Sequence, residues 1–234
     1  MKNTDHLTHD SIGHSHEAHG HHDHSLKEEL VTHLPYAIFS VAFGLILLTL
    51  LSYFSLSNTD AKMFKKGYMM LFHSFHFLHV LFASTGTVLT FLRFSSNRLK
   101  AVVVGVISPV IFCILSDIFL PYIGGMILGQ TMSLHICFVN EWVNVVPFLI
   151  VGMLNGFLLA SHFSEFGRIF SVGSHFAHIL ISSLASLFYM VSHGFNNWQP
   201  QMGLVFIVLI LAVLLPCTLS DVVVPMYFAG AKKK

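Results

Sequence analysis

Histidines and aspartates stand inside stretches of this sequence that are otherwise apolar. The set comprises two pairs of histidines and two single aspartates, namely His76, His79, Asp117, His175, His178 and Asp221. The members of each pair are three residues apart, which places both imidazoles on one face of an α-helix. An ionisable side chain in a lipid-embedded helix is costly and is a functional candidate by default. We therefore predict that these six side chains form the functional site.

Imidazole and carboxylate groups together are typical ligands of a divalent transition metal. The combination suits Zn²⁺ best and is also compatible with Fe²⁺, Mn²⁺, Co²⁺ and Ni²⁺. Ca²⁺ and Mg²⁺ prefer shells made of oxygen alone, so a set this rich in nitrogen argues against them. Cys113 and Cys217 each precede an aspartate by one helical turn. They are either additional soft ligands or small packing residues.

The composition indicates that these residues belong to a membrane protein. Apolar residues make up 54% of the 234 residues and charged residues only 10%, and the mean hydropathy is +0.73. A soluble protein carries about 25% charged residues, so the expected surroundings are a lipid bilayer. The net charge of +1 argues against a nucleic-acid partner, because phosphates need a basic surface. Three cysteines are too few for a disulfide framework.

Six apolar segments are long enough to cross a bilayer as helices. They cover residues 34–57, 67–92, 101–129, 144–163, 172–193 and 202–229. Each holds about 20 residues or more, which matches a hydrocarbon core of about 30 Å. The alternation typical of a transmembrane β-barrel is missing. We predict an all-α polytopic membrane protein with six transmembrane helices, in which residues 130–143 form a loop or an interfacial segment.

The sequence also contains an internal repeat. The nine residues from His76 match the nine from His175 at five positions, and those from Cys113 match those from Cys217 at five. The chain therefore divides into two three-helix repeats, residues 31–130 and 131–230. Because three is odd, the second repeat would enter the membrane from the opposite side. Inverted-topology repeats of this kind occur in secondary transporters, whose sites lie near the midplane between the halves.

Prolines follow both aspartates at the same distance. Pro121 and Pro225 stand four residues after Asp117 and Asp221. Proline has no N–H to bond the carbonyl four residues earlier. The sequence therefore predicts that the carbonyls of the two aspartates are free, beside their carboxylates, to face a cation.

The N-terminal residues 1–30 form a polar tail that we expect to be disordered and cytoplasmic. Eight histidines alternate there with acidic and small residues: His6, His9, His14, His16, His19, His21, His22 and His24. Such a tract is a flexible, low-affinity chelator. In composition it resembles the histidine-rich cytoplasmic segments of zinc and other transition-metal transporters. That resemblance implies a role in sensing or buffering metal.

The orientation follows from the positive charges. With six crossings, one side holds nine Lys or Arg residues, including the basic end at residues 231–234, and the other side holds three. Positive residues concentrate on the cytoplasmic side. We therefore expect a multi-pass protein of the cell (inner or plasma) membrane with both termini in the cytoplasm.

The function predicted from these patterns is transport of a divalent transition metal by a secondary permease, and not catalysis. No nucleotide-binding motif is present, which excludes a self-contained ATP-driven pump. Six helices are few to enclose a pathway, which favours a homodimer. Two alternatives stay open. One is a b-type haem electron carrier with paired axial histidines, and the other is an intramembrane zinc-dependent hydrolase, although HExxH is missing.

Overall fold

The protein is built from helices. The computed structural model describes residues 26–56 and 61–230, with side chains for residues 30–54, 63–161 and 173–230. This part contains helices and connections but no strand, which confirms the predicted all-α class. Residues 1–25 of the predicted tail and the basic end at 231–234 lie outside the described residues.

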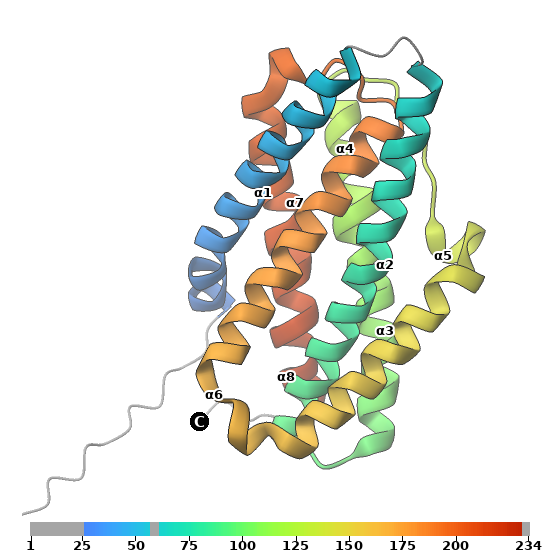
Figure 1. Cartoon of the computed structure of the whole chain (residues 1–234). Helices are drawn as coiled ribbons and strands as arrows, with labels where there is room; N and C mark the ends of the chain where they lie inside the picture. Colours follow the sequence, from blue (N-terminus) through green and yellow to red (C-terminus); the bar gives the residue numbers. More distant parts are fainter. Residues whose placement is uncertain (1–25, 57–60, 231–234) are drawn as a thin grey trace, which may run out of the picture.

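Six helical segments in the described part are long and apolar enough to cross a membrane, as the sequence predicts. They are Leu30–Phe54, Met63–Phe94, Arg98–Ile127, Trp142–Ser161, Gly173–Ser192 and Gln199–Phe228. Helices α1 (Leu26–Leu56) and α2 (Ala61–Phe94) hold the first two spans. Helix α6 (Trp142–Ser192) holds both the fourth and the fifth, and Figure 1 shows it changing direction between them.

The third and sixth spans are each composed of several shorter elements. The third comprises α3 (Arg98–Ile114), the π-helical segment η1 (Leu115–Phe119) and α4 (Leu120–Ile127). The sixth comprises the 3₁₀ turn η2 (Gln199–Gln201), α7 (Met202–Thr218), the π-helical segment η3 (Leu219–Val223) and α8 (Val224–Phe228). The short helix α5 (Cys137–Asn140) lies in the connection between α4 and α6, within the predicted loop or interfacial segment.

The two π-helical segments occupy matching positions of the internal repeat, so matching sequences adopt matching local geometry. In η1 the N–H of Leu120 bonds to the carbonyl of Leu115, five residues back. In η3 the N–H of Val224 bonds to the carbonyl of Leu219 in the same way. Each segment carries an aspartate, and π-bulges are common at functional sites. The inverted orientation of the repeats stays a prediction.

The π register also moves the free carbonyl away from the position that the sequence predicts. Counting five residues back, Pro121 lies opposite the carbonyl of Ser116 and not that of Asp117. The Ser116 carbonyl accepts a hydrogen bond from the hydroxyl of Ser186 at 3.0 Å. In the other repeat the Ser220 carbonyl accepts one from Thr87 at 3.1 Å. The carbonyls released by the prolines therefore join helices together.

The two ends of the bundle are identified by the helix ends that lie there. Figure 1 shows the start of α1 and helix α8 at one end, which we call the N-terminal end. The start of α2 and the C-terminal end of α6 lie at the opposite end, which we call the distal end. Which membrane the bundle occupies, and which end is cytoplasmic, stay predictions.

Helices α2 and α6 form the most extensive contact of the bundle, because two glycines let their backbones meet. A Cβ atom on Gly152 would overlap the carbonyl oxygen of Leu81, and one on Gly156 would lie 2.9 Å from that of Thr85. The hydroxyl of Thr85 donates to the Gly152 carbonyl at 3.0 Å. Small residues four apart are a common means of close helix packing in membranes. This contact fixes α2, which carries half of the predicted histidines.

We expect Gly152→Ala to destabilise the protein, because the added methyl group must displace the backbone of α2. Overpacking of this kind costs about 1–3 kcal/mol. Thermal unfolding of the purified protein in detergent measures the effect. Gly203→Ala is the matched control, since no heavy atom lies within 4 Å of a Cβ at that position. Equal unfolding temperatures for the two variants would contradict the close contact between α2 and α6.

Candidate metal site

The six side chains predicted from the sequence lie in one continuous group inside the bundle. They come from α2, η1, the second span of α6, and η3. Five of them are buried, namely His76, His79, Asp117, His178 and Asp221. The sixth, His175, has a side chain that is 29% exposed. Four segments far apart in the sequence therefore converge on a single polar interior.

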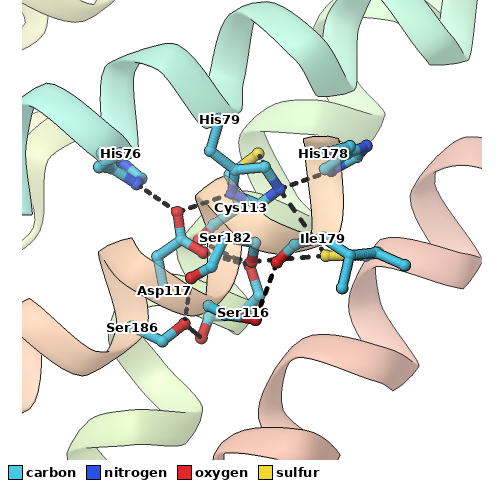
Figure 2. A network of polar contacts seen from close by, with 11 residues as sticks. His76, His79, Cys113, Ser116, Asp117, His178, Ile179, Ser182 and Ser186 are labelled. Atoms are coloured by element: carbon cyan, nitrogen blue, oxygen red, sulfur yellow. Dashed lines mark hydrogen bonds and ion pairs between the residues drawn. The ribbon is translucent and has the colours of Figure 1, made fainter. Parts of the chain in front are cut away.

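Asp117 holds two imidazoles at once. Its Oδ2 atom accepts from Nδ1 of His76 at 2.8 Å and from Nδ1 of His79 at 2.7 Å (Figure 2). Its Oδ1 atom accepts from the hydroxyls of Ser116 and Ser182 at 2.8 and 2.9 Å. Because an ionised carboxylate only accepts, each ring must donate from Nδ1. The Nε2 atoms of both histidines are then left with free lone pairs.

Asp221 repeats this arrangement in the second half of the chain with fewer contacts. Its Oδ2 atom pairs with Nδ1 of His178, and Nδ1 of His175 lies 4.0 Å away. Its Oδ1 atom is buried and has no hydrogen-bond partner among the described residues. Gly86 of α2 leaves room for this carboxylate, since a Cβ there would lie 3.2 Å from Oδ2. His178, like His79, therefore bonds to a carboxylate through Nδ1 and presents Nε2 on the other side of its ring.

The two halves meet where these Nε2 atoms face each other. Nε2 of His79 and Nε2 of His178 lie 2.6 Å apart (Figure 2). Two neutral rings held in this way point lone pair at lone pair, which is unfavourable unless a proton or a cation lies between them. The Sγ atom of Cys217 lies 3.7 Å from Nε2 of His79, and that of Cys113 lies 3.9 Å from it.

We call the group of His79, His178 and Cys217 the central site. One ligand atom from each residue lies within 4.8 Å of those of the other two, and all three residues are buried. Metal-binding histidines usually donate their other ring N–H to a carboxylate, which fixes the ring and raises its basicity. Asp117 and Asp221 make this contact here. The arrangement can hold one ion with two nitrogens and one sulfur.

The structure distinguishes the predicted residues that face the central site from those that hold them in place. Both aspartates stand behind the imidazoles, on the Nδ1 side, while Cys217 occupies a position that faces both Nε2 atoms. His76 bonds to Asp117 but does not belong to the central site, and its Nε2 atom is buried without a partner in the described part of the chain. His175 lies nearest the N-terminal end and contacts His33, with ring centroids 5.2 Å apart.

Sequence reasoning did not assign a role to a second group of donors. His73, His135 and Cys137 also bring one ligand atom each within 4.8 Å of one another. Two of them lie in the connection before α6, where no helical periodicity draws attention to them. The signal that could have found them is an imidazole and a thiol two residues apart in a short segment between apolar spans.

Comparison with protein-family models, curated proteins and solved structures finds no match to this chain. The function must therefore be inferred from the residues and their geometry. What the structure supports is a multi-pass membrane protein with buried histidine, aspartate and cysteine groups that are compatible with metal binding.

Proposed function

We propose that this protein is a secondary permease that carries a divalent transition metal, most suitably zinc, across a membrane. The observation that carries the proposal is the contact between His79 and His178. Two imidazoles from matching halves of the chain present their Nε2 atoms to each other inside a membrane bundle. Each is held from behind by a buried aspartate.

In this proposal the central site is the transport site. Nε2 of His79, Nε2 of His178 and Sγ of Cys217 are its inner ligands, and Sγ of Cys113 lies 3.9 Å from Nε2 of His79. A tetrahedral zinc ion with bonds of about 2 Å holds two nitrogens roughly 3.3 Å apart. The rings need to part only slightly to admit it. Thiolate sulfur favours zinc over manganese or magnesium.

The charges of the site also favour a divalent cation. Burying an ion in a medium of low dielectric constant costs several kcal/mol unless opposite charges accompany it. Asp117 and Asp221 together supply two negative charges behind the two rings. They balance the two positive charges of a divalent ion, and a Cys217 thiolate would leave the loaded site with one net negative charge.

The four histidines of the internal repeat form a row along the bundle, the histidine file, which suits movement of an ion. Because α2 runs from the distal end and the second span of α6 runs from the N-terminal end, their order along the bundle follows from the helix directions. That order is His76, His79, His178 and His175. An ion could pass between neighbouring imidazoles, and protons that replace it would couple its movement to a proton gradient.

The alternative functions require arrangements that the described residues do not favour. Axial ligation of haem separates two imidazole nitrogens by about 4 Å, twice a metal–nitrogen bond, with a broad macrocycle between the rings. The 2.6 Å contact between His79 and His178 leaves no such plane. A zinc hydrolase needs an open coordination position that substrate and water can reach, whereas the residues of the central site are buried.

A comparison of ions tests the proposed function. In proteoliposomes that contain the wild-type protein and a trapped metal indicator, we expect saturable uptake of Zn²⁺. We expect at least about tenfold slower uptake of Ca²⁺ and Mg²⁺, because a site of two nitrogens and one sulfur binds them poorly. Liposomes without protein give the leak rate. If Zn²⁺ entry does not exceed this leak, or if Mg²⁺ enters as fast as Zn²⁺, the proposal is wrong.

A further inference from the structure

Three potential metal ligands lie together outside the central site. We call His73, His135 and Cys137 the distal cluster. Nε2 of His73 lies 3.3 Å from Nε2 of His135, and all three ligand atoms are within 4.8 Å of one another. His73 belongs to α2, whereas His135 and Cys137 come from the connection between α4 and α6. The proposed central site uses none of them.

The fold holds this connection in place against the end of α6. The N–H of Ser133 donates to the carbonyl of His193 at 2.8 Å. The N–H of His135 donates to the hydroxyl oxygen of Tyr189 at 3.2 Å, and that hydroxyl donates to the carbonyl of Ser133 at 3.3 Å. Gly194 allows the close approach, because a Cβ there would overlap the carbonyl oxygen of Thr131. The position of His135 opposite His73 is therefore built into the fold.

Neighbouring side chains contact the ring of His135. The amide nitrogen Nδ2 of Asn140 lies 3.1 Å from Nδ1 of His135. Metal binding at Nε2 requires the amide to be turned over, so that its oxygen accepts the Nδ1 proton. The ring of His193 stacks on that of His135, with centroids 5.6 Å apart. Burial raises the pKa of the Cys137 thiol to about 12, so a bound metal would have to displace its proton.

The distal cluster stands at one end of the histidine file. His73 precedes His76 by three residues on α2, on the side that leads to the distal end. His76 has a buried Nε2 atom without a partner in the described part, and its ring lies 6.0 Å from that of Phe138, the residue after Cys137. His73 and His135 are only partly buried, whereas the central site is enclosed. An ion that leaves or enters the file at this end meets the distal cluster.

We propose that His73, His135 and Cys137 form a second binding site for a thiophilic divalent metal, through which the ion passes between the distal end and the central site. Its position in the path rests on the proposed transport function, whereas metal binding by the cluster does not. Two nitrogens and one sulfur leave a fourth position for water. An ion held by three protein ligands exchanges more readily than one that is fully enclosed.

Cobalt binding by the full-length protein tests this site. Thiolate bound to Co²⁺ absorbs strongly in the near ultraviolet, and the histidine-rich tail has no cysteine, so the tail adds nothing to this band. In the variant Cys113→Ser with Cys217→Ser, Cys137 is the remaining thiol. We expect a thiolate–cobalt band in this variant. Adding His135→Ala should weaken cobalt binding at least about tenfold, whereas His33→Ala, at the N-terminal end, should not change it.

The single variant Cys137→Ser gives a second measurement that changes the fold little. At saturating Co²⁺ its thiolate–cobalt band should be weaker than that of the wild type. Absence of a band in the double cysteine variant, together with an unchanged band in Cys137→Ser, would overturn the second site whatever the transport assays show. If the bands behave as expected while proteoliposomes show no zinc uptake, the second site stands and the proposed transport function fails.

Discussion

Replacing His79 and His178 together with alanine should abolish zinc transport. Their Nε2 atoms are the pair through which the two halves of the chain meet, and both rings are buried. Removing two of three inner ligands should weaken zinc binding more than 100-fold, since even a change behind a ligand costs 10–100-fold. Initial rates of zinc uptake into proteoliposomes and calorimetric titration of the purified protein measure the two effects.

The control for this variant is an exposed polar residue of α1. Thr49→Ala removes a hydroxyl that donates to the carbonyl of Leu45 within its own helix, and neither residue belongs to the central site. It should transport zinc at the wild-type rate. Thermal unfolding shows whether the double histidine variant still folds. A folded double variant that retains more than about a tenth of wild-type uptake would show that the His79–His178 contact is not on the transport path.

The architecture could be predicted because lipid demands long apolar helices. Each of the six predicted segments corresponds to a span, since about 20 apolar residues suffice for a crossing. The local helix geometry within and between the spans is harder to predict from the sequence. Helix α6 continues through the residues between its two spans, where the predicted apolar segments 144–163 and 172–193 leave a break. The π-helical turns at η1 and η3 depend on prolines together with tertiary hydrogen bonds, such as that from Ser186 to Ser116.

The site residues stood out because histidine and aspartate are expensive in lipid, but their arrangement required the fold. Sequence spacing places His76 and His79 on one face of a helix, and it cannot show which ring nitrogen faces the partner helix. The position of Asp117 behind both rings follows from the meeting of α2 with η1. Cys217 stayed ambiguous because thiols are also ordinary packing residues. His135 and Cys137 reach His73 through a folded connection without periodicity.

Replacing Asp117 with asparagine should lower both the zinc affinity and the stability of the protein. Asp117 accepts four hydrogen bonds, two from imidazoles and two from serine hydroxyls. An amide can accept through only one of its two polar atoms, so some of these buried donors lose their partner. Each such loss costs about 1–3 kcal/mol. We expect Asp117→Asn to lower zinc affinity 10–100-fold, because it frees the ring of His79 and removes one negative charge, and to lower the unfolding temperature as well.

Asp221→Asn is the comparison that isolates metal binding from stability. Asp221 holds His178 through Oδ2, but its Oδ1 atom has no partner among the described residues and His175 lies 4.0 Å away. The variant should lower zinc affinity by a similar factor, since it too leaves one inner imidazole unheld and removes one charge. It should disturb folding less, since fewer donors lose an acceptor. Zinc titration and thermal unfolding of both variants, each without metal, measure the two quantities. Equal losses of stability would mean that the two aspartates are held alike. Unchanged zinc affinity in both would show that neither carboxylate supports a metal ligand.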